Sequence, residues 1–401
     1  MAELISVDEA LRLIAGTVRV LEPEIVTLDA AAGRTLAEDM IARMTQPPFA
    51  ASAMDGYAVR IGDVRTPGAR LTVIGESAAG ARFVGSVGAG EAVRIFTGAP
   101  MPAGADHVLI QEDARAEGAG VAVVEAQARA GNVRPAGVDF RKGAVLASKG
   151  ERLTGPKLAL IAAGNIDSVR VIRAPRVAII ANGDELAPPG AALSEDAIVS
   201  SIPYGLAPMI AEWGGAPRFV GIARDDAADI RRMIEAAADS DLIAPVGGAS
   251  VGDRDFMRAG FAGCGAAPVF EKVSIKPGKP SWFATMANGR FVLGLPGNPA
   301  SALVTARIFL KTAIDRFLGR AGAAEARNYR LHAPLGAAGP RETFLRARLV
   351  DAPDGERAVE AFDNQDSSLL SVLAMSDVLI RRRAGAGPAQ AGERVSCLKW
   401  R

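Results

Sequence analysis

Five short segments of the chain combine acidic residues, lysines and glycines in a way that could hold a charged ligand. They are residues 182–185, 224–226, 247–255, 276–280 and 294–299. Glycines let backbone amides approach a ligand closely, lysines neutralise its oxygens, and carboxylates hold Mg²⁺. Brought together by the fold, these segments would form a site for a phosphorylated ligand with a divalent metal.

Strand-like and helix-like patterns alternate around these segments between residues 176 and 318. Strand candidates cover 177–180, 218–222, 242–246 and 291–295, and helical patterns cover 206–213, 227–238 and 300–318. This alternation predicts a parallel sheet with helices on both faces. Ligands of such sheets bind beyond the carboxyl ends of the strands. Four of the five segments follow a strand candidate, and 276–280 lies between two, so we expect all five at one rim.

The rest of the chain is mostly β-like. Ser6 and Glu9 form a capping-box pattern that predicts an N-terminal helix, and a second helix is expected at Gly155–Ala163. Short apolar segments separated by glycine and proline indicate a compact β-rich region; they lie at 71–74, 92–96, 107–110 and 121–124. After residue 321 the chain is again β-rich, with strands expected at 344–349 and 378–382.

Composition excludes several classes of protein. The 46 basic and 45 acidic residues nearly cancel, so no global field favours nucleic acid or an anionic membrane. The two cysteines and two histidines form no zinc or disulfide motif. No apolar stretch is long enough to span a bilayer and the first residues do not resemble a signal peptide, so we expect a soluble, cytoplasmic protein.

These segments allow two other interpretations. Any single acid or lysine could be an ordinary solvated loop residue, although five such loops together favour function. The pattern Gly248-Ala-Ser-Val-Gly252 also fits a nucleophile elbow, with Ser250 as nucleophile and His332 as the single downstream histidine. That hydrolase hypothesis is weak because the pattern is short, and labelling with a fluorophosphonate would test it. No Walker A sequence is present.

Six motifs resemble one known family. They are Pro48-Phe-Ala-Ala-Ser-Ala-Met-Asp-Gly-Tyr-Ala58, Arg94-Ile-Phe-Thr-Gly-Ala-Pro-Met-Pro102, Gly183-Asp-Glu185 and the segments 247–255, 276–280 and 295–301. In type, order and spacing they resemble the MoeA family, which includes the C-terminal domain of gephyrin. The resemblance covers nearly the whole chain.

The resemblance implies a multidomain α/β plus β fold. Residues 1–25 would pack a helix on the α/β domain; 26–45 and 144–175 would form a split, elongated N-terminal domain, and 46–143 a β-rich domain. Residues 176–320 would form the α/β molybdopterin-binding domain and 321–401 a C-terminal β-barrel-like domain. The family also implies a homodimer whose active site joins the α/β domain of one subunit to the β-rich domain of the other.

The implied function lies in molybdenum-cofactor biosynthesis. Molybdate is inserted into adenylylated molybdopterin, and AMP is released with Mg²⁺ required. Small-molecule pterin and molybdate would be the ligands, and an adenylyltransferase or acceptor molybdoenzymes the protein partners, with no nucleic acid and no membrane. A non-catalytic paralogue or scaffold is the alternative, and binding of pterin without turnover would distinguish it.

The implied site residues fall into three groups. The catalytic set is Asp55, Asp139, Glu185, Asp225, Asp255, Lys272 and Lys276, and Glu185 and Asp255 are also the expected metal ligands. The substrate-binding set is Thr97, Gly247, Gly248, Ser250, Lys279, Pro296, Pro299, Ser301, Arg346 and Ser367. Other interpretations of single residues stay open. Asp55 could be a turn residue, and Pro296 and Pro299 could only shape their loop. Arg346 could be a surface residue, and Ser368 could take the place of Ser367.

The chain also departs from the family pattern near the expected phosphate site. Val246 stands where a serine is usual, and Ser200-Ser201-Ile202 replaces an Asp-Ser/Thr-Asn triplet; Asn182 and Ala249 are milder changes. Because a hydroxyl and polar side chains are lost, we expect altered nucleotide affinity.

Overall fold

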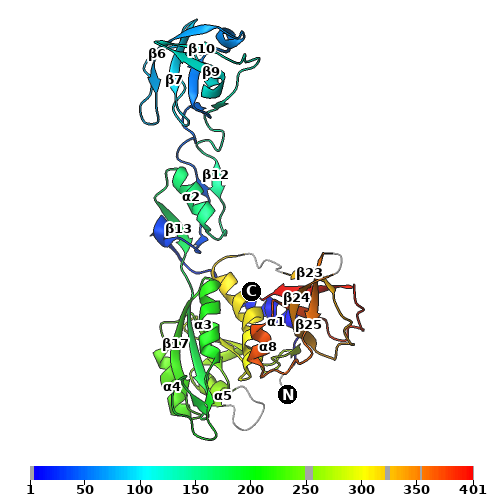
Figure 1. The fold of residues 1–401 in the computed structure, drawn as a ribbon. Coiled ribbons are helices and arrows are strands. Elements are labelled where there is room, and N and C mark those ends of the chain that lie inside the picture. The colour runs from blue at the N-terminus through cyan, green and yellow to red at the C-terminus, as the bar shows by residue number, and fades with distance from the viewer. Residues whose placement is uncertain (1–3, 249–255, 321–325, 353–354, 401) are drawn as a thin grey trace. The chain divides into compact units, whose positions relative to one another are not determined.

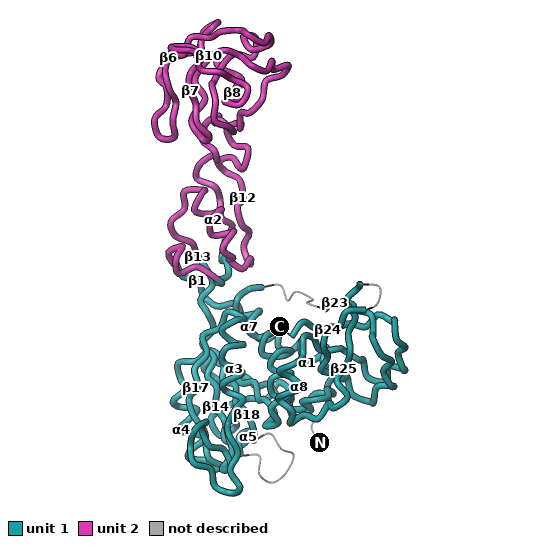
Figure 2. The backbone as a smooth tube through the Cα atoms, viewed as in Figure 1, with its two compact units in different colours: residues 1–24, 33–37, 170–401 teal, residues 25–32, 38–169 magenta. Residues whose placement is uncertain are grey.

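The computed structural model describes residues 4–248, 256–320, 326–352 and 355–400. The chain forms two compact units, shown in Figure 2. Unit 1 consists of Met1–Glu24, Gly33–Ala37 and Arg170–Arg401, and unit 2 of Ile25–Ala32 and Glu38–Val169. Ser250 and Asp255, two of the expected site residues, lie outside the described residues.

Unit 2 is built on a six-stranded sheet in the order β8-β5-β7-β6-β10-β9. Its strands are β5 (Gly56–Val59), β6 (Arg70–Ser77), β7 (Glu91–Ile95), β8 (His107–Ile110), β9 (Ala114–Glu117) and β10 (Gly120–Val123). Neighbours are antiparallel except β6 and β7, which run parallel. All four predicted strands of this region are confirmed, and β5 and β9 are additional. Helix α2 occupies Gly155–Ala163 as predicted.

The first half of unit 1 is an α/β sheet in the order β17-β14-β18-β22-β21-β19. Its strands are β14 (Arg176–Asn182), β17 (Ala216–Ala223), β18 (Leu242–Val246), β19 (Ala266–Phe270), β21 (Trp282–Met286) and β22 (Phe291–Gly294). The four predicted strands, β17, β14, β18 and β22, are parallel. The predicted parallel arrangement of these four strands is confirmed, and two strands that were not predicted, β21 and β19, continue the sheet antiparallel.

Helices cover both faces of this sheet (Figure 1). They are α1 (Val7–Thr17), α3 (Ile202–Glu212), α4 (Ala227–Ala236), α5 (Phe256–Gly263), α6 (Pro299–Thr305), the π-helical segment η4 (Ala306–Leu310) and α7 (Lys311–Phe317). Val177 and Ile179 of β14 belong to the core formed with α1, α3, α6 and α7. Ala178 and Ile180, which point the other way, pack with α4 and α5. Helix α1 is capped by the Ser6 hydroxyl as predicted, but the Glu9 side chain pairs with Arg12.

The second half of unit 1 is a closed five-stranded barrel. Its strands are β23 (Ala326–Leu331), β24 (Glu342–Asp351), β25 (Arg357–Ala361), β26 (Val378–Arg382) and β27 (Arg394–Lys399). Closure follows because β24 pairs with both β25 and β26. Strand β20 (Ile275–Lys276) leaves the α/β region and adds parallel to β24. The predicted strands at 344–349 and 378–382 are confirmed, and so is the overall fold class.

Short elements complete the chain. They are β1 (Pro23–Thr27), η1 (Leu28–Ala30), β2 (Thr35–Leu36), β3 (Met40–Ile41), β4 (Ala51–Ser52), η2 (Ile61–Val64), η3 (Gln111–Asp113), β11 (Val133–Arg134), β12 (Val145–Ala147), β13 (Ser168–Ile172), β15 (Leu186–Ala187), β16 (Ile198–Val199) and α8 (Leu370–Ala374). Among the described residues, no helix combines the length and apolar character needed to cross a membrane.

Gly294 provides a test of the packing at the carboxyl end of β22. It pairs with Trp282 of β21, and a Cβ at Gly294 would lie 1.8 Å from the indole Nε1. Because Trp282 is buried, Gly294→Ala should cost about 1–3 kcal/mol through overpacking and lower Tm by several degrees. The matched control is Gly263→Ala at the end of α5, where a Cβ meets no atom within 4 Å. Equal Tm values for the two variants in thermal unfolding would contradict the close packing.

Candidate functional site

Two adjoining hollows lie where β14, β18 and β22 end. The larger, the lysine cleft, has a volume of about 780 Å³; its described lining is Gly248, Lys276, Pro277, Gly278, Lys279, Pro280, Pro296, Gly297, Asn298, Ser301, Arg341, Asn364, Gln365, Asp366 and Ser367. The smaller, the glycine pocket, has about 430 Å³ and is lined by Ala181, Asn182, Glu185, Leu186, Ile198, Val199, Ser200, Ser201, Ile202, Pro203, Val246, Gly247, Gly248, Gly297, Asn298, Pro299 and Ser368. The two share Gly248, Gly297 and Asn298, so one extended ligand could occupy both.

The lysine cleft is positively charged. Lys276, Lys279 and Arg341 line it, and in the described part of the chain none of the three is ion-paired. Asp366 is the one carboxylate among the described lining residues. Its Oδ1 accepts bonds from the hydroxyl (2.6 Å) and the amide (2.8 Å) of Ser368, which lower its pKa. Such a cleft favours an anionic ligand.

The wall formed by residues 364–368 is held from behind by Arg346. This arginine is 1% exposed, and its Nη1 donates to the backbone oxygen of Asp366 (2.6 Å) while Nε donates to Oε1 of Gln365 (3.1 Å). Burial lowers the pKa of its guanidinium. Asn298 adds a bond from Nδ2 to the Ser367 hydroxyl (2.9 Å). Arg346 is therefore neither a surface residue nor part of the described lining; it positions the loop that carries Ser367.

Two glycines are required by close approaches at this site. Gly278 has a φ of +108°, and a Cβ there would lie 2.1 Å from Cγ2 of Thr305. Gly248 has a φ of +62°, and a Cβ there would lie 2.4 Å from Oδ1 of Asn182. Because only glycine fits, the segments between Lys276 and Lys279 and after β18 lie directly against their neighbours.

The glycine pocket combines an exposed carboxylate with backbone turns. Glu185 lies at its edge, after β14. Asn182 is 4% exposed, and its Nδ2 donates to the backbone oxygens of Ala223 (3.3 Å) and Arg224 (3.2 Å). This side chain links the carboxyl ends of β14 and β17. Asp225 lies on the adjoining turn, where its amide donates to Asp184.

Asp55, Thr97 and Asp139 lie in unit 2. Oδ1 of Asp55 accepts bonds from the amide and the hydroxyl of Thr97, both 2.7 Å, and these bonds hold the pKa of Asp55 below its ordinary value. Gly56, the next residue, would clash with the backbone of β8 if it carried a Cβ. Asp139 is exposed on a separate loop. Asp55 is therefore fixed as an ionised acceptor.

Most of the predicted residues of unit 1 converge on the two hollows. Lys276, Lys279, Gly248, Pro296, Ser301 and Ser367 line the lysine cleft, and Glu185, Gly247 and Pro299 line the glycine pocket. Lys272 and Asp225 are in neither described lining. Sequence reasoning missed Arg341, Asn298 and Gln365; the position of Arg341 beside β24 depends on the pairing of β20 with β24, which no local pattern reveals.

Fold and site together define a multidomain α/β protein with a cationic, glycine-shaped site for an anionic small molecule. Three family profiles match: MoeA N-terminal region (domain I and II) at residues 5–164, probable molybdopterin binding domain at 178–316, and MoeA C-terminal region (domain IV) at 328–400. The chain belongs to the MoeA family.

Relatives and solved structures agree with this family. A molybdopterin molybdenumtransferase of Nostoc sp. is 37% identical over 82% of this chain and 77% of its own length. That of Haemophilus influenzae is 33% identical over 94% and 93%. The crystal structure of a molybdopterin biosynthesis MoeA protein from Pyrococcus horikosii covers 100% of both chains with a TM-score of 0.82 and 29% identity.

The effect of Thr97 on the pKa of Asp55 can be tested by titration. In Thr97→Ala the hydroxyl donor is lost while the backbone amide, the stronger cause of the shift, remains. The pKa of Asp55 should therefore rise toward its ordinary value without fully reaching it. Carboxyl ¹³C NMR titration of the full chain measures the shift, with Thr66→Ala, an exposed threonine of unit 2, as the control. An unchanged pKa in Thr97→Ala would mean that the hydroxyl does not bind the carboxylate in solution.

Proposed function

We propose that this chain inserts molybdate into adenylylated molybdopterin with Mg²⁺-dependent release of AMP, using the lysine cleft and the glycine pocket as one continuous site. The broader activity, that of a molybdopterin molybdenumtransferase in molybdenum-cofactor biosynthesis, is the activity of its family, and the chain is an enzyme. The observation that carries the finer proposal is that Lys276, Lys279 and Arg341 line one cleft and form no ion pair with any residue that the structure describes. The serine hydrolase alternative does not require that set, and AMP release distinguishes the enzyme from a paralogue that binds pterin without turnover.

Within this proposal the lysine cleft receives molybdate. Molybdate is a doubly charged tetrahedral oxyanion, so it gains most from fixed donors where water is excluded. Lys276 and Lys279, on either side of Gly278 in the sequence, supply positive charge. The hydroxyls of Ser301 and Ser367 supply hydrogen-bond donors. Arg346 acts through the loop that it holds rather than by contact with the oxyanion.

The glycine pocket would hold the pterin adenylate. The turns at Gly247 and Gly248 would let backbone amides approach a phosphate closely. Ser200 and Ser201 would supply hydroxyls at the position where the resemblance predicts an Asp-Ser/Thr-Asn triplet. Displacement at phosphorus needs charge neutralisation more than a strong base, which suits a site with few titratable groups. Asp225 and Lys272, which lie in neither described lining, stay in the proposed catalytic set.

Mg²⁺ fits the donors at the edge of this pocket. The described residues contain no cluster of three histidine, cysteine or acidic side chains. Mg²⁺ commonly uses one or two carboxylates together with substrate phosphates, however. Glu185 is exposed at the pocket, and Asp255 is proposed as the second ligand. The ion would neutralise charge on the phosphoanhydride; the chain supplies the carboxylates and the turns that orient the adenylate.

Lys279→Ala should raise the molybdate requirement more than it weakens binding of the pterin adenylate. Loss of a charged hydrogen bond costs about 1.5–3 kcal/mol, or roughly tenfold to a hundredfold in affinity. The larger adenylate spreads its contacts over both hollows, so one lysine matters less to it. AMP release against molybdate concentration gives the first quantity and calorimetry the second, with Lys149→Ala, an exposed lysine of unit 2, as control. If Lys279→Ala left the molybdate dependence unchanged but abolished pterin binding, Lys279 would belong to the phosphate site and not to the molybdate site.

We further propose a cytoplasmic homodimer in which Asp55, Thr97 and Asp139 of one subunit serve the site of the other. Support comes from the Asp55–Thr97 pair, in which the two bonds from Thr97 keep the Asp55 carboxylate ionised and in a fixed position. At a low molybdate concentration at which Lys279→Ala releases no AMP, mixing Asp55→Asn subunits with Lys279→Ala subunits should restore part of the lost AMP release, because each heterodimer retains one intact site. Heterodimers that form but stay as inactive as the parents would reject the shared site.

A further inference from the structure

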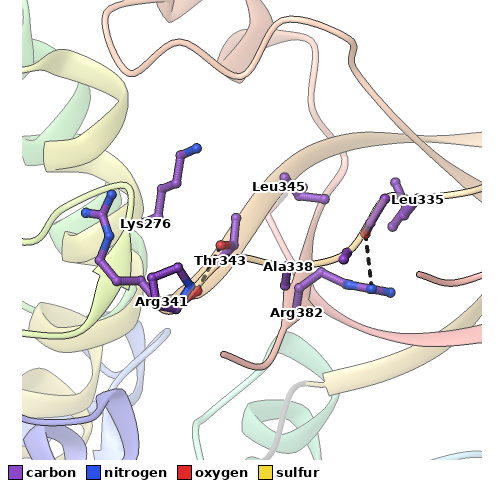
Figure 3. A pocket seen from close by; sticks show the side chains of 11 residues that line it. Lys276, Leu335, Ala338, Arg341, Thr343, Leu345 and Arg382 are labelled. Carbon is purple, nitrogen blue, oxygen red and sulfur yellow. Dashed lines mark hydrogen bonds between the residues drawn. The ribbon is translucent and has the colours of Figure 1, made fainter. Parts of the chain in front are cut away.

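The described lining of the lysine cleft contains one carboxylate, that of Asp366. Asp366 is exposed, and the other charged side chains of this lining are those of Lys276, Lys279 and Arg341. Nη1 of Arg341 donates to the backbone oxygen of Ile275 (3.3 Å), which places it next to Lys276; Figure 3 shows these two side chains in an adjoining hollow of about 330 Å³ that they also line. Asp366 forms no ion pair with them or with any other residue that the structure describes. A cleft that favours anions therefore keeps one negative charge that its own cations do not neutralise.

The Asp366 carboxylate is held in place and kept ionised by its own loop. Its Oδ1 accepts bonds from the hydroxyl (2.6 Å) and the amide (2.8 Å) of Ser368, which hold the pKa of Asp366 below its ordinary value. The backbone oxygen of Asp366 accepts a bond from Nη1 of the buried Arg346 (2.6 Å), and its amide donates to Oδ1 of Asn364 (3.0 Å). No described residue donates to Oδ2. This second carboxylate oxygen is therefore available to a ligand.

The other side-chain acceptors of this lining are neutral, and two of them are already engaged. Oε1 of Gln365 accepts bonds from the backbone amide (2.9 Å) and Nε (3.1 Å) of Arg346, while its Nε2 donates to two backbone oxygens. Oδ1 of Asn364 accepts the bond from the amide of Asp366. The lysine and arginine side chains of the cleft only donate. Asp366 is therefore the only charged acceptor that the described lining offers to a ligand.

One part of the proposed substrate suits such a carboxylate. The phosphoanhydride of adenylylated molybdopterin and molybdate itself are anionic, so an ionised carboxylate repels both. The pterin ring is neutral, and one edge of it carries two adjacent donors, the ring N3–H and the 2-amino group. Adenine, by contrast, has an acceptor nitrogen beside its amino group. Because an ionised carboxylate only accepts hydrogen bonds, and charge-assisted bonds are the stronger ones, the donor edge of the pterin is the matching partner.

We propose that Asp366 binds the donor edge of the pterin through Oδ2. This inference rests on the proposed function and assigns to one residue the recognition of the pterin, as distinct from the phosphates and from molybdate. In adenylylated molybdopterin the dithiolene lies between the pterin and the phosphates. Asp366 lines the lysine cleft, and Ser368, two positions later, lines the glycine pocket. A substrate held at its pterin by Asp366 and at its adenylate by the glycine pocket presents its dithiolene within the lysine cleft, where molybdate is proposed to bind.

The test is Asp366→Asn in the full chain, because an amide oxygen can still accept the bonds from Ser368 while the negative charge is lost. In calorimetry, the affinity for adenylylated molybdopterin should fall at least about tenfold. The affinity for AMP alone, which lacks the pterin, should not fall. A carboxylate without a role in binding gives the opposite sign, since removal of a negative charge strengthens the binding of an anionic ligand. Asp363→Asn, which changes an exposed acid outside the described lining, is the matched control.

Thermal unfolding verifies that each variant is folded, and Asp366→Ser, which keeps a short acceptor for the Ser368 amide, replaces Asp366→Asn if that variant does not fold. Unchanged or tighter binding of adenylylated molybdopterin by the folded variant would overturn the inference. Equal losses of affinity for adenylylated molybdopterin and for AMP would also overturn it, because Asp366 would then act on the adenylate. If the unaltered chain bound no adenylylated molybdopterin, the proposed function itself would be rejected, which distinguishes the two failures.

Discussion

Burial of β14 and β18 on both faces is the constraint on which the rest of this structure depends. Alternate residues of β14 enter two different cores, so neither face of the strand can carry a functional polar group. Chemistry is confined to the point where each strand ends, and there Asn182, Gly247 and Pro296 begin the loops of the site. The antiparallel strands β21 and β19 extend the sheet without adding to this rim, and β20 connects it to the barrel.

That connection explains why one site is built from such distant segments. β20 is two residues long, yet its pairing with β24 sets Lys276 beside Thr343 and brings Arg341 to the lysine cleft. Arg346, further along β24, holds the loop that supplies Ser367. The barrel thus supplies part of the lining of the lysine cleft. The cationic residues lie close together because the free energy of backbone pairing outweighs their mutual repulsion. An anionic ligand would remove that repulsion, which links binding to the stability of the junction.

Sequence reasoning predicted the parts of the fold with strong local signals and missed those set by long-range pairing. β18 has the predicted bounds because its apolar run is continuous, and α2 and β26 also have the predicted bounds. β19 is rich in alanine and contains a proline, and β21 carries no alternation, so neither is evident before the sheet is known. Arg346 illustrates the same limit at the site, since its burial depends on hydrogen bonds to residues about 20 positions away. The bond between Asp55 and Thr97 spans 42 positions and is equally invisible to spacing.

Two residues that depart from the expected family pattern, Val246 and Asn182, line the glycine pocket. Val246, where a serine is usual, is 3% exposed at the end of β18, so its side chain adds apolar packing in place of a hydroxyl. Nearby, Asn182 uses its Nδ2 to join the turns after β14 and β17, and its Oδ1 is buried against Gly248 and accepts no hydrogen bond from any residue that the structure describes. Because an unpaired buried acceptor is costly, a donor that reaches Oδ1 when ligand fills the pocket would be favoured. Val246 therefore adds packing to the wall of the glycine pocket, and Asn182 offers the pocket a buried acceptor.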